Sequence, residues 1–126
     1  MHGVPVDLPL AGFVGCTLDQ ICIGQFQLQF HFSGERGTGG GRISVEGGWD
    51  LQDSAAAEID CDQEHYERQH YKLHVLLGRT VSSFTIDAPR SFQLLFDSGH
   101  RLTVYDDNER YETFSVEPAD EAGVFI

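Results

Sequence analysis

The sequence predicts a mainly β (α+β) fold in which two pseudo-symmetric antiparallel β-meander repeats pack around one core, with one connecting helix. Three observations support this prediction: blocks that occur twice in the same order, apolar residues that alternate with polar ones, and one segment with helical spacing. The 126 residues suit a single domain with one core. We place repeat one at about 10–53, the helical connection at about 54–77, repeat two at about 78–117 and an acidic tail at 118–126.

Three blocks of sequence occur in both halves of the chain. The pairs are 15–23 (GCTLDQICI) with 78–86 (GRTVSSFTI), 26–30 (FQLQF) with 92–96 (FQLLF), and 42–46 (RISVE) with 101–105 (RLTVY). Because the order is the same in both halves, we expect the same strands in the same order in each.

The strongest strand pattern covers residues 26–32, where apolar and polar residues alternate as Phe26, Leu28, Phe30 and Phe32 against Gln27, Gln29 and His31. This period of two is typical of an antiparallel strand with one buried face. Shorter versions follow at 42–46 and 101–105. Trp49 with Leu51 is the counterpart of Phe114 with Val116, and Trp49 is expected to anchor the core of repeat one.

The first block of each repeat interrupts the alternation at the same place. Leu18 and Ile21 are three residues apart, and so are Val81 and Phe84, with the next apolar residue two positions further on. A β-bulge or a turn at the entrance of the strand would explain this spacing in both copies.

Residues 54–77 do not follow a strand pattern. Tyr66, His70, Leu73 and Leu77 have the four-three-four spacing of one helix face. Gly78 stands at the expected C-terminal cap, and Asp60 or Asp62 is the expected N-cap. The glycine-rich loop at 34–41 lacks the Lys-Ser/Thr pair of a phosphate-binding loop, so we expect a flexible hairpin connection there.

The chain is strongly acidic, with 20 Asp and Glu against 8 Lys and Arg and a net charge of −12. Nucleic acids and anionic membrane surfaces are therefore not expected partners. The acids concentrate in two segments, Asp50, Asp53, Glu58, Asp60, Asp62, Glu64 and Glu67, and Asp106, Asp107, Glu109, Glu112, Glu117, Asp120 and Glu121. The charge serves either solubility or attraction of a basic protein. For a basic partner, the candidate contact residues are Asp106, Asp107, Glu109, Asp60, Asp62 and Glu64.

Histidines in the connection form a candidate metal site. His70 and His74 are four residues apart, with His65 and Cys61 upstream, so one helix face would present two imidazoles to a metal ion. A third ligand would have to come from Cys61, His65, Asp60 or elsewhere. The glutamate of an HExxH motif is missing between His70 and His74. A half-exposed polar helix face is the competing interpretation, and no cofactor is expected.

No catalytic constellation is recognisable, so the chain is not expected to be an enzyme. Ser98 and His100 are the one close Ser and His pair, and no GxSxG motif is present. Three cysteines match no disulfide framework, and no signal peptide or membrane span is recognisable. We expect a cytoplasmic protein.

The pattern G-x-T-[LV]-x-x-[IF]-x-I, an F-x-L-x-F strand and a strand leading to W-x-L make one half. The second half opens with LLGRTV at 76–81 and closes with YETFSV at 111–116. Over residues 10–117 these motifs resemble a family of small uncharacterised bacterial proteins built from two similar halves. That family has no assigned activity, so the resemblance implies no functional residues. In size and charge the chain also resembles immunity proteins of contact-dependent toxin systems, which implies binding of a basic toxin.

Three functional hypotheses follow. The first is a non-enzymatic acidic protein-binding module, in its most specific form an immunity-type inhibitor of a basic protein. The second is a structural or self-associating module, a homodimer paired through an exposed edge strand such as residues 26–32. The third is a metal or small-ligand binder that uses His65, His70 and His74.

Overall fold

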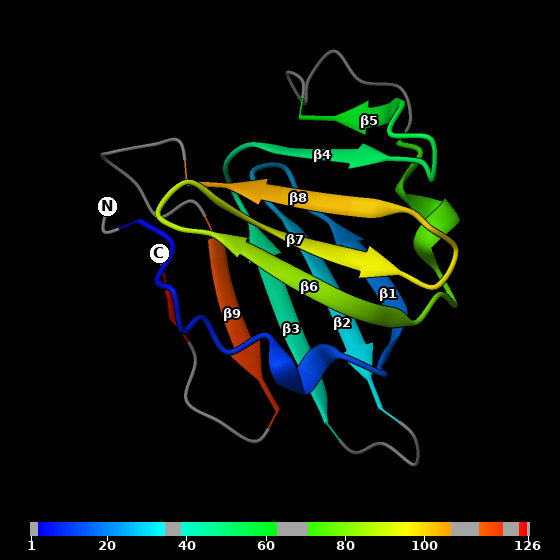
Figure 1. The fold of residues 1–126 in the computed structure, drawn as a ribbon. Helices are drawn as coiled ribbons and strands as arrows, with labels where there is room; N and C mark the ends of the chain where they lie inside the picture. Colours follow the sequence, from blue (N-terminus) through cyan, green and yellow to red (C-terminus); the bar gives the residue numbers. More distant parts are fainter. Residues whose placement is uncertain (1–2, 35–38, 63–70, 107–113, 120–123, 126) are drawn as a thin grey trace.

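The computed structural model describes residues 3–34, 39–62, 71–106, 114–119 and 124–125, which form two antiparallel five-stranded sheets packed face to face (Figure 1). Sheet A has the order β1 (Thr17–Ile23), β2 (Leu28–Ser33), β3 (Gly40–Val45), β9 (Phe114–Pro118) and β10 (Val124–Phe125). Sheet B has the order β5 (Glu58–Cys61), β4 (Trp49–Gln52), β8 (Arg101–Tyr105), β7 (Ser91–Phe96) and β6 (Val81–Asp87). Two short 3-10 helices, η1 (Ala11–Phe13) and η4 (Leu73–Leu76), are the helices of the described residues. The predicted mainly β fold is confirmed.

Each repeat contributes a three-stranded meander to one sheet and its fourth strand to the other. Strands β1–β3 lie together in sheet A, but β4 pairs with β8 in sheet B. Conversely, β6–β8 lie together in sheet B, and β9 pairs with β3 in sheet A. The two halves therefore exchange their fourth strands, and each sheet contains strands of both repeats.

The pairing confirms one predicted equivalence and corrects another. Trp49 lies opposite Val104 and Phe114 lies opposite Val45, so Trp49 and Phe114 are counterparts, as expected. In the same way Leu28 pairs with Val45 and Phe92 pairs with Val104. Leu28 therefore corresponds to Phe92. The sequence comparison aligns Phe26 with Phe92, so the correct alignment of this block is shifted by two residues.

Both first strands carry the irregularity that the apolar spacing predicts. The register shifts between Leu18 and Gln20 in β1 and between Val81 and Ser83 in β6. These are corresponding positions of the two repeats, so the prediction of a bulge in both copies is confirmed.

The entrances to β1 and β6 are joined by reciprocal backbone hydrogen bonds. The Gly15 N–H donates to the Val81 carbonyl oxygen over 2.8 Å, and the Gly78 N–H donates to the Leu18 carbonyl oxygen over 2.9 Å. Exchanging the two repeats converts one bond into the other. A twofold superposition of the complete halves stays a prediction.

The core lies between the sheets and is closed at one edge by residues 3–13. In strand β2 the apolar residues Leu28, Phe30 and Phe32 face this core and are buried, whereas Gln29 and His31 lie on the outer face. Phe92 of sheet B and Phe114 of sheet A meet edge to face with ring centroids 5.0 Å apart. The residues that fill the core are Val4, Leu8, Leu10, Phe13, Cys16, Leu18, Leu28, Phe30, Phe32, Ile43, Val45, Trp49, Leu51, Leu73, Leu76, Val81, Phe92, Leu94, Phe96, Leu102, Val104, Phe114 and Val116.

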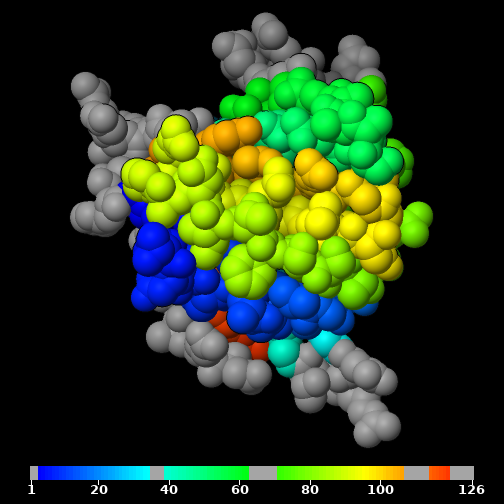
Figure 2. Space-filling model, in the orientation of Figure 1, coloured from blue at the N-terminus to red at the C-terminus, as the bar shows by residue number. Residues whose placement is uncertain are grey.

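Trp49 is buried as predicted. Its strand β4 belongs to repeat one but lies in sheet B, beside the strands of repeat two. Its ring stacks on Tyr71 with centroids 6.5 Å apart. At the opposite edge, the Val4 N–H donates to the Pro89 carbonyl oxygen over 2.9 Å. Figure 2 shows the resulting outer face, where β6 and β7 lie between the N-terminal segment and the region of β4 and β5.

In its described residues, the connection between the repeats differs from the predicted helix. Glu58–Cys61 is strand β5, and Leu73–Leu76 is a single 3-10 turn, while residues 63–70 lie outside the described part. Asp60 is not an N-cap residue, because it lies in β5 and accepts a hydrogen bond from the Lys72 N–H through Oδ2 over 2.7 Å. The residues at the expected start of the helix pair with β4 instead. The expected acidic tail contains the end of β9 and all of β10.

Glycines at the start of β3 allow the neighbouring strands to approach. A Cβ on Gly41 would lie 2.2 Å from the Glu117 carbonyl oxygen, and one on Gly40 would lie 2.4 Å from the Phe32 carbonyl oxygen. Their φ angles of +135° and +77° also favour glycine. The described end of the predicted loop 34–41 is thus part of the sheet, and residues 35–38 lie outside the described part.

Candidate functional site

The two acidic segments of the sequence begin at the same end of sheet B. The Asp62 N–H donates to the Trp49 carbonyl oxygen and the Tyr105 N–H donates to the Gly48 carbonyl oxygen, each over 3.0 Å. Asp62 follows β5 and Asp106 follows β8, so both leave the sheet beside the first residues of β4 (Figure 1). We call Asp50, Asp62 and Asp106, together with Glu58 at the other end of β5, the acidic pole.

Carboxylates of the acidic pole raise the pKa of Tyr105. Its hydroxyl donates a hydrogen bond to Asp50 Oδ2. This hydrogen bond, then burial, and then the charges of Asp50, Glu58 and Asp62 raise the pKa of Tyr105 to about 12. Three carboxylates from β4, β5 and the end of β5 therefore act on one hydroxyl of β8.

Of the candidate partner-binding residues, the structure brings Asp62 and Asp106 to one end of the sheet. Asp62 is exposed and Asp106 is half-buried. Asp60 is buried, and its carboxylate accepts hydrogen bonds from the N–H groups of Cys61 and Lys72, so it serves the fold. The other candidates, Glu64, Asp107 and Glu109, lie outside the described residues.

The candidate metal ligands are described only in part. His74 lies exposed in η4, a 3-10 turn and not the predicted α-helix, and His65 and His70 lie outside the described residues. Among the residues that the structure describes, no group of three or more His, Cys, Asp and Glu is arranged to hold a metal ion.

Ser98 and His100 meet in the turn between β7 and β8. Ser98 Oγ and His100 Nδ1 lie 2.7 Å apart. The neighbouring Asp97 accepts a hydrogen bond from the Thr80 N–H through Oδ1 over 3.3 Å, which fixes the turn against the entrance of β6. These contacts explain the pair as part of the turn.

No described helix has the length and apolar character needed to cross a bilayer.

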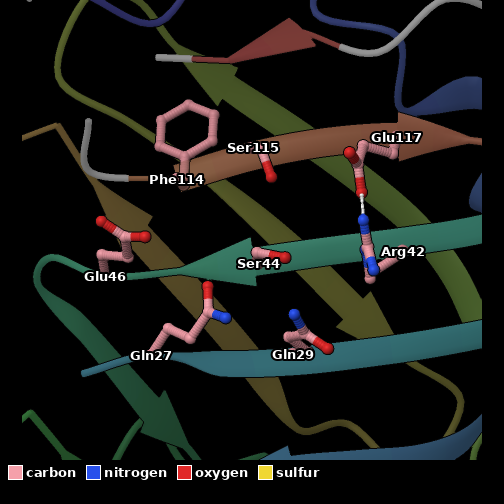
Figure 3. A pocket seen from close by; sticks show the side chains of 8 residues that line it. All are labelled: Gln27, Gln29, Arg42, Ser44, Glu46, Phe114, Ser115 and Glu117. Atoms are coloured by element: carbon pink, nitrogen blue, oxygen red, sulfur yellow. Dashed lines mark hydrogen bonds and ion pairs between the residues drawn. The ribbon is translucent and has the colours of Figure 1, made fainter. Parts of the chain in front are cut away.

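A polar hollow of about 240 Å³ lies on the outer face of sheet A (Figure 3). Gln29, Ser44 and Ser115 form a row across β2, β3 and β9. At one end Arg42 forms an ion pair with Glu117. The residues that line the hollow are Gln27, Gln29, Arg42, Ser44, Glu46, Phe114, Ser115 and Glu117.

Sequence reasoning missed this hollow because its residues come from strands of both repeats. The alternation at 26–32 correctly placed Gln27 and Gln29 on a polar face. It carried no sign that Ser115 and Glu117 would lie on the same face, since that depends on the exchange of β9 into sheet A.

Two apolar side chains are exposed at the tip of the hairpin between β1 and β2. Ile23 is 54% exposed and Phe26 is 75% exposed. The Gly24 N–H closes the turn by donating to the Gln27 carbonyl oxygen over 2.8 Å. Gln27, which follows Phe26 in the chain, lines the hollow. Ile23 lies opposite the buried Leu28 and therefore belongs to the core-facing side of the sheet.

A family model described as "Family of unknown function (DUF6188)" matches residues 9–117. The match covers the span for which the sequence motifs predicted a family without an assigned activity. No curated protein and no solved structure matches the chain.

Proposed function

The chain belongs to the family of unknown function DUF6188, and we propose that this member of the family is a non-enzymatic acidic module that binds a basic protein through the acidic pole. The observation that carries this proposal is that both acidic segments begin beside the first residues of β4. Acids that are far apart in the sequence thereby contribute to one local field.

The charge favours a partner with an excess of Lys and Arg. A net charge of −12 attracts such a protein over a distance, and a local concentration of carboxylates orients it on approach. The segments that continue from Asp62 and Asp106 carry further acids in their sequence, Glu64 and Glu67, and Asp107, Glu109 and Glu112. The pole is therefore the expected centre of the contact.

Immunity-type inhibition of a basic toxin is the specific form that we propose. An inhibitor of this kind acts by occupying its target, so it needs no catalytic group of its own. The small size and acidic charge of the chain support this form.

The experiment is affinity capture from an extract of the source cells at low and high salt. The wild-type chain is compared with Glu58→Gln/Asp62→Asn, which removes two charges from the pole. Asp7→Asn/Asp87→Asn removes two charges from other exposed positions and is the matched control. We expect a basic protein to be retained at low salt by the wild type and the control, and lost with the pole variant. Equal retention by both variants, or an acidic partner, would contradict the proposal.

Self-association is the second candidate, by a different strand from the one expected. Strand β2 is not an edge, because it pairs with β1 and β3 on its two sides. Strand β1 is an edge of sheet A, and the exposed Ile23 and Phe26 lie at its end. Sedimentation of the wild type and of Phe26→Ser tests this candidate, and a monomer at high concentration removes it.

A further inference from the structure

We propose that the hollow on sheet A binds the guanidinium group of one arginine side chain presented by a protein partner. The proposal names the residue type that a basic partner inserts, and to that extent it rests on the proposed function. It concerns a different surface from the acidic pole, namely the outer faces of β2, β3 and β9 (Figure 3).

The size of the hollow suits a single side chain. Pockets that bind whole small-molecule ligands have volumes of about 300–1,000 Å³. The hollow has about 240 Å³ and lies open on the sheet surface, so it admits one long side chain and not a large ligand.

The charge of the hollow suits a cation. Its charged groups are Glu46, Arg42 and Glu117, two carboxylates against one guanidinium. Arg42 is already engaged, since Nε and Nη2 both contact Glu117 Oε2. Glu46 lies near the other end, is exposed, and has no side-chain hydrogen bond or ion pair with another described residue. An anion would meet this free carboxylate, whereas a cation would be stabilised by it.

The floor of the hollow provides hydrogen-bond acceptors. Ser44 and Ser115 are only 8% and 6% exposed, and no side-chain hydrogen bond joins either hydroxyl to the rest of the described chain. Gln29 lies beside Ser44 in the same row. A guanidinium group carries five N–H donors and no acceptor, so it can bond to these oxygens and to Glu46 together.

An exposed aromatic residue stands one position before the lining of the hollow in the chain. Phe26 precedes Gln27, which lines the hollow, and is 75% exposed. Arginine and large aromatic residues are both enriched among the residues that contribute most to binding in protein interfaces. An exposed Phe26 so close in the chain to the lining favours a partner protein over a free small cation as the source of the guanidinium.

The test is an NMR titration of the whole protein with N-acetyl-arginine-N-methylamide, which has an arginine side chain and no charged termini. The matched probe is the citrulline analogue, which has nearly the same shape and no charge. We expect saturable shifts of the Ser44 and Ser115 amide signals with the arginine probe only. Saturable shifts with both probes, or with neither, overturn the proposal.

Matched variants locate the site. Glu46→Gln should weaken binding of the arginine probe about tenfold or more, because a charge-assisted hydrogen bond is lost. Ser44→Ala should weaken it by a smaller factor. Glu58→Gln changes the acidic pole by the same charge and should leave the affinity unchanged. Equal losses from Glu46→Gln and Glu58→Gln would show a general charge effect and overturn the proposal.

The same variants separate this proposal from the proposed function. If Glu46→Gln captures a basic protein from cell extract as well as the wild type does, the hollow is not used and the proposed function stands. If no basic protein is captured but the arginine probe binds as described, the hollow stands and the proposed function fails.

Discussion

Thr17 and Thr80 face each other across an antiparallel bridge, with their hydroxyl oxygens 3.5 Å apart. They are corresponding residues of the two repeats, and the bridge joins the entrance of β1 in sheet A to that of β6 in sheet B. Gly15 and Gly78 stand two residues before them, with φ angles of +85° and +79°. The two repeats thus meet through corresponding residues at this point.

This relationship predicts equal effects of two distant substitutions. Gly15→Ala and Gly78→Ala should each lower the free energy of unfolding by about 1–2 kcal/mol, because alanine disfavours a positive φ. An added Cβ would meet no atom within 4 Å at either position, so the backbone cost alone should act. Urea unfolding of both variants measures the two values. A loss in one variant only would argue against equivalent surroundings.

Gly41→Ala should destabilise the chain more strongly. Its added Cβ would lie 2.2 Å from the Glu117 carbonyl oxygen and push β3 away from β9. We expect a loss of about 3 kcal/mol or more in the free energy of unfolding. Gly12→Ala is the control, because its Cβ would meet nothing within 4 Å. Equal stabilities of the two variants would contradict the close approach of β3 and β9.

Tyr105 predicts a loss of stability at alkaline pH. Its pKa is raised from 10.0 to about 12 in the folded chain, chiefly by the hydrogen bond to Asp50. The folded state therefore holds this proton more tightly than the unfolded state does. The contribution is complete below pH 10.0 and is lost as the pH rises to about 12.

Unfolding at a series of pH values should show a steeper decline in this window for the wild type than for Tyr105→Phe. In an ultraviolet pH titration that follows phenolate formation, the most alkaline step should be absent from Tyr105→Phe. Asp50→Asn should move this step to lower pH. An unchanged titration in Tyr105→Phe would rule out the assignment.

Cys16 should react more slowly with iodoacetamide than Cys22 and Cys61. Burial raises the pKa of the Cys16 thiol, with the charge of Asp19 adding to the effect and a backbone hydrogen bond from Gly40 opposing it. Since the thiolate is the reactive form, burial and pKa both slow the reaction. Mass spectrometry of the alkylated peptides gives the order, and labelling in urea is the control that should remove it. Fast labelling of Cys16 in the folded protein would contradict its burial.

The exchange of fourth strands predicts that a nicked chain stays together. A protease site inserted between residues 62 and 71 would yield two fragments, each holding strands of both sheets. We expect the fragments to co-elute in size-exclusion chromatography under native conditions and to separate in urea. Each half expressed alone should lack a dispersed NMR spectrum. A half that folds by itself would show that the exchange is not needed.

Strand patterns and local irregularities could be read from the sequence because each depends on nearby residues. The alternation around Phe30 and the bulges at Leu18 and Val81 are of this kind. The two-residue error in the second block has a simple cause, since a slip of two keeps every side chain on the same face. Leu28 and Phe30 therefore satisfy the pattern equally well in either alignment.

Strand partners and the candidate sites could not be read in this way. The alternation in β4 shows which face is apolar, but not that β8 is its neighbour. Strand β5 was missed because Asp60 is buried there, held by hydrogen bonds that include the distant Lys72 N–H. The pairs Tyr105 with Asp50 and Arg42 with Glu117 each join residues of both repeats. Their proximity follows from the exchange of strands.

The crossing of β9 into sheet A also has a consequence for synthesis on the ribosome. Strand β3 is translated about 70 residues before β9, which corresponds to roughly 4–14 s at the usual elongation rates. During that time the edge of β3 that pairs with β9 in the folded protein has no partner. Sheet B, which covers Phe30 and Ile43 in the folded protein, is also incomplete. The nascent chain therefore presents an apolar surface that a chaperone can bind, and completion of both sheets is a late, nearly simultaneous event.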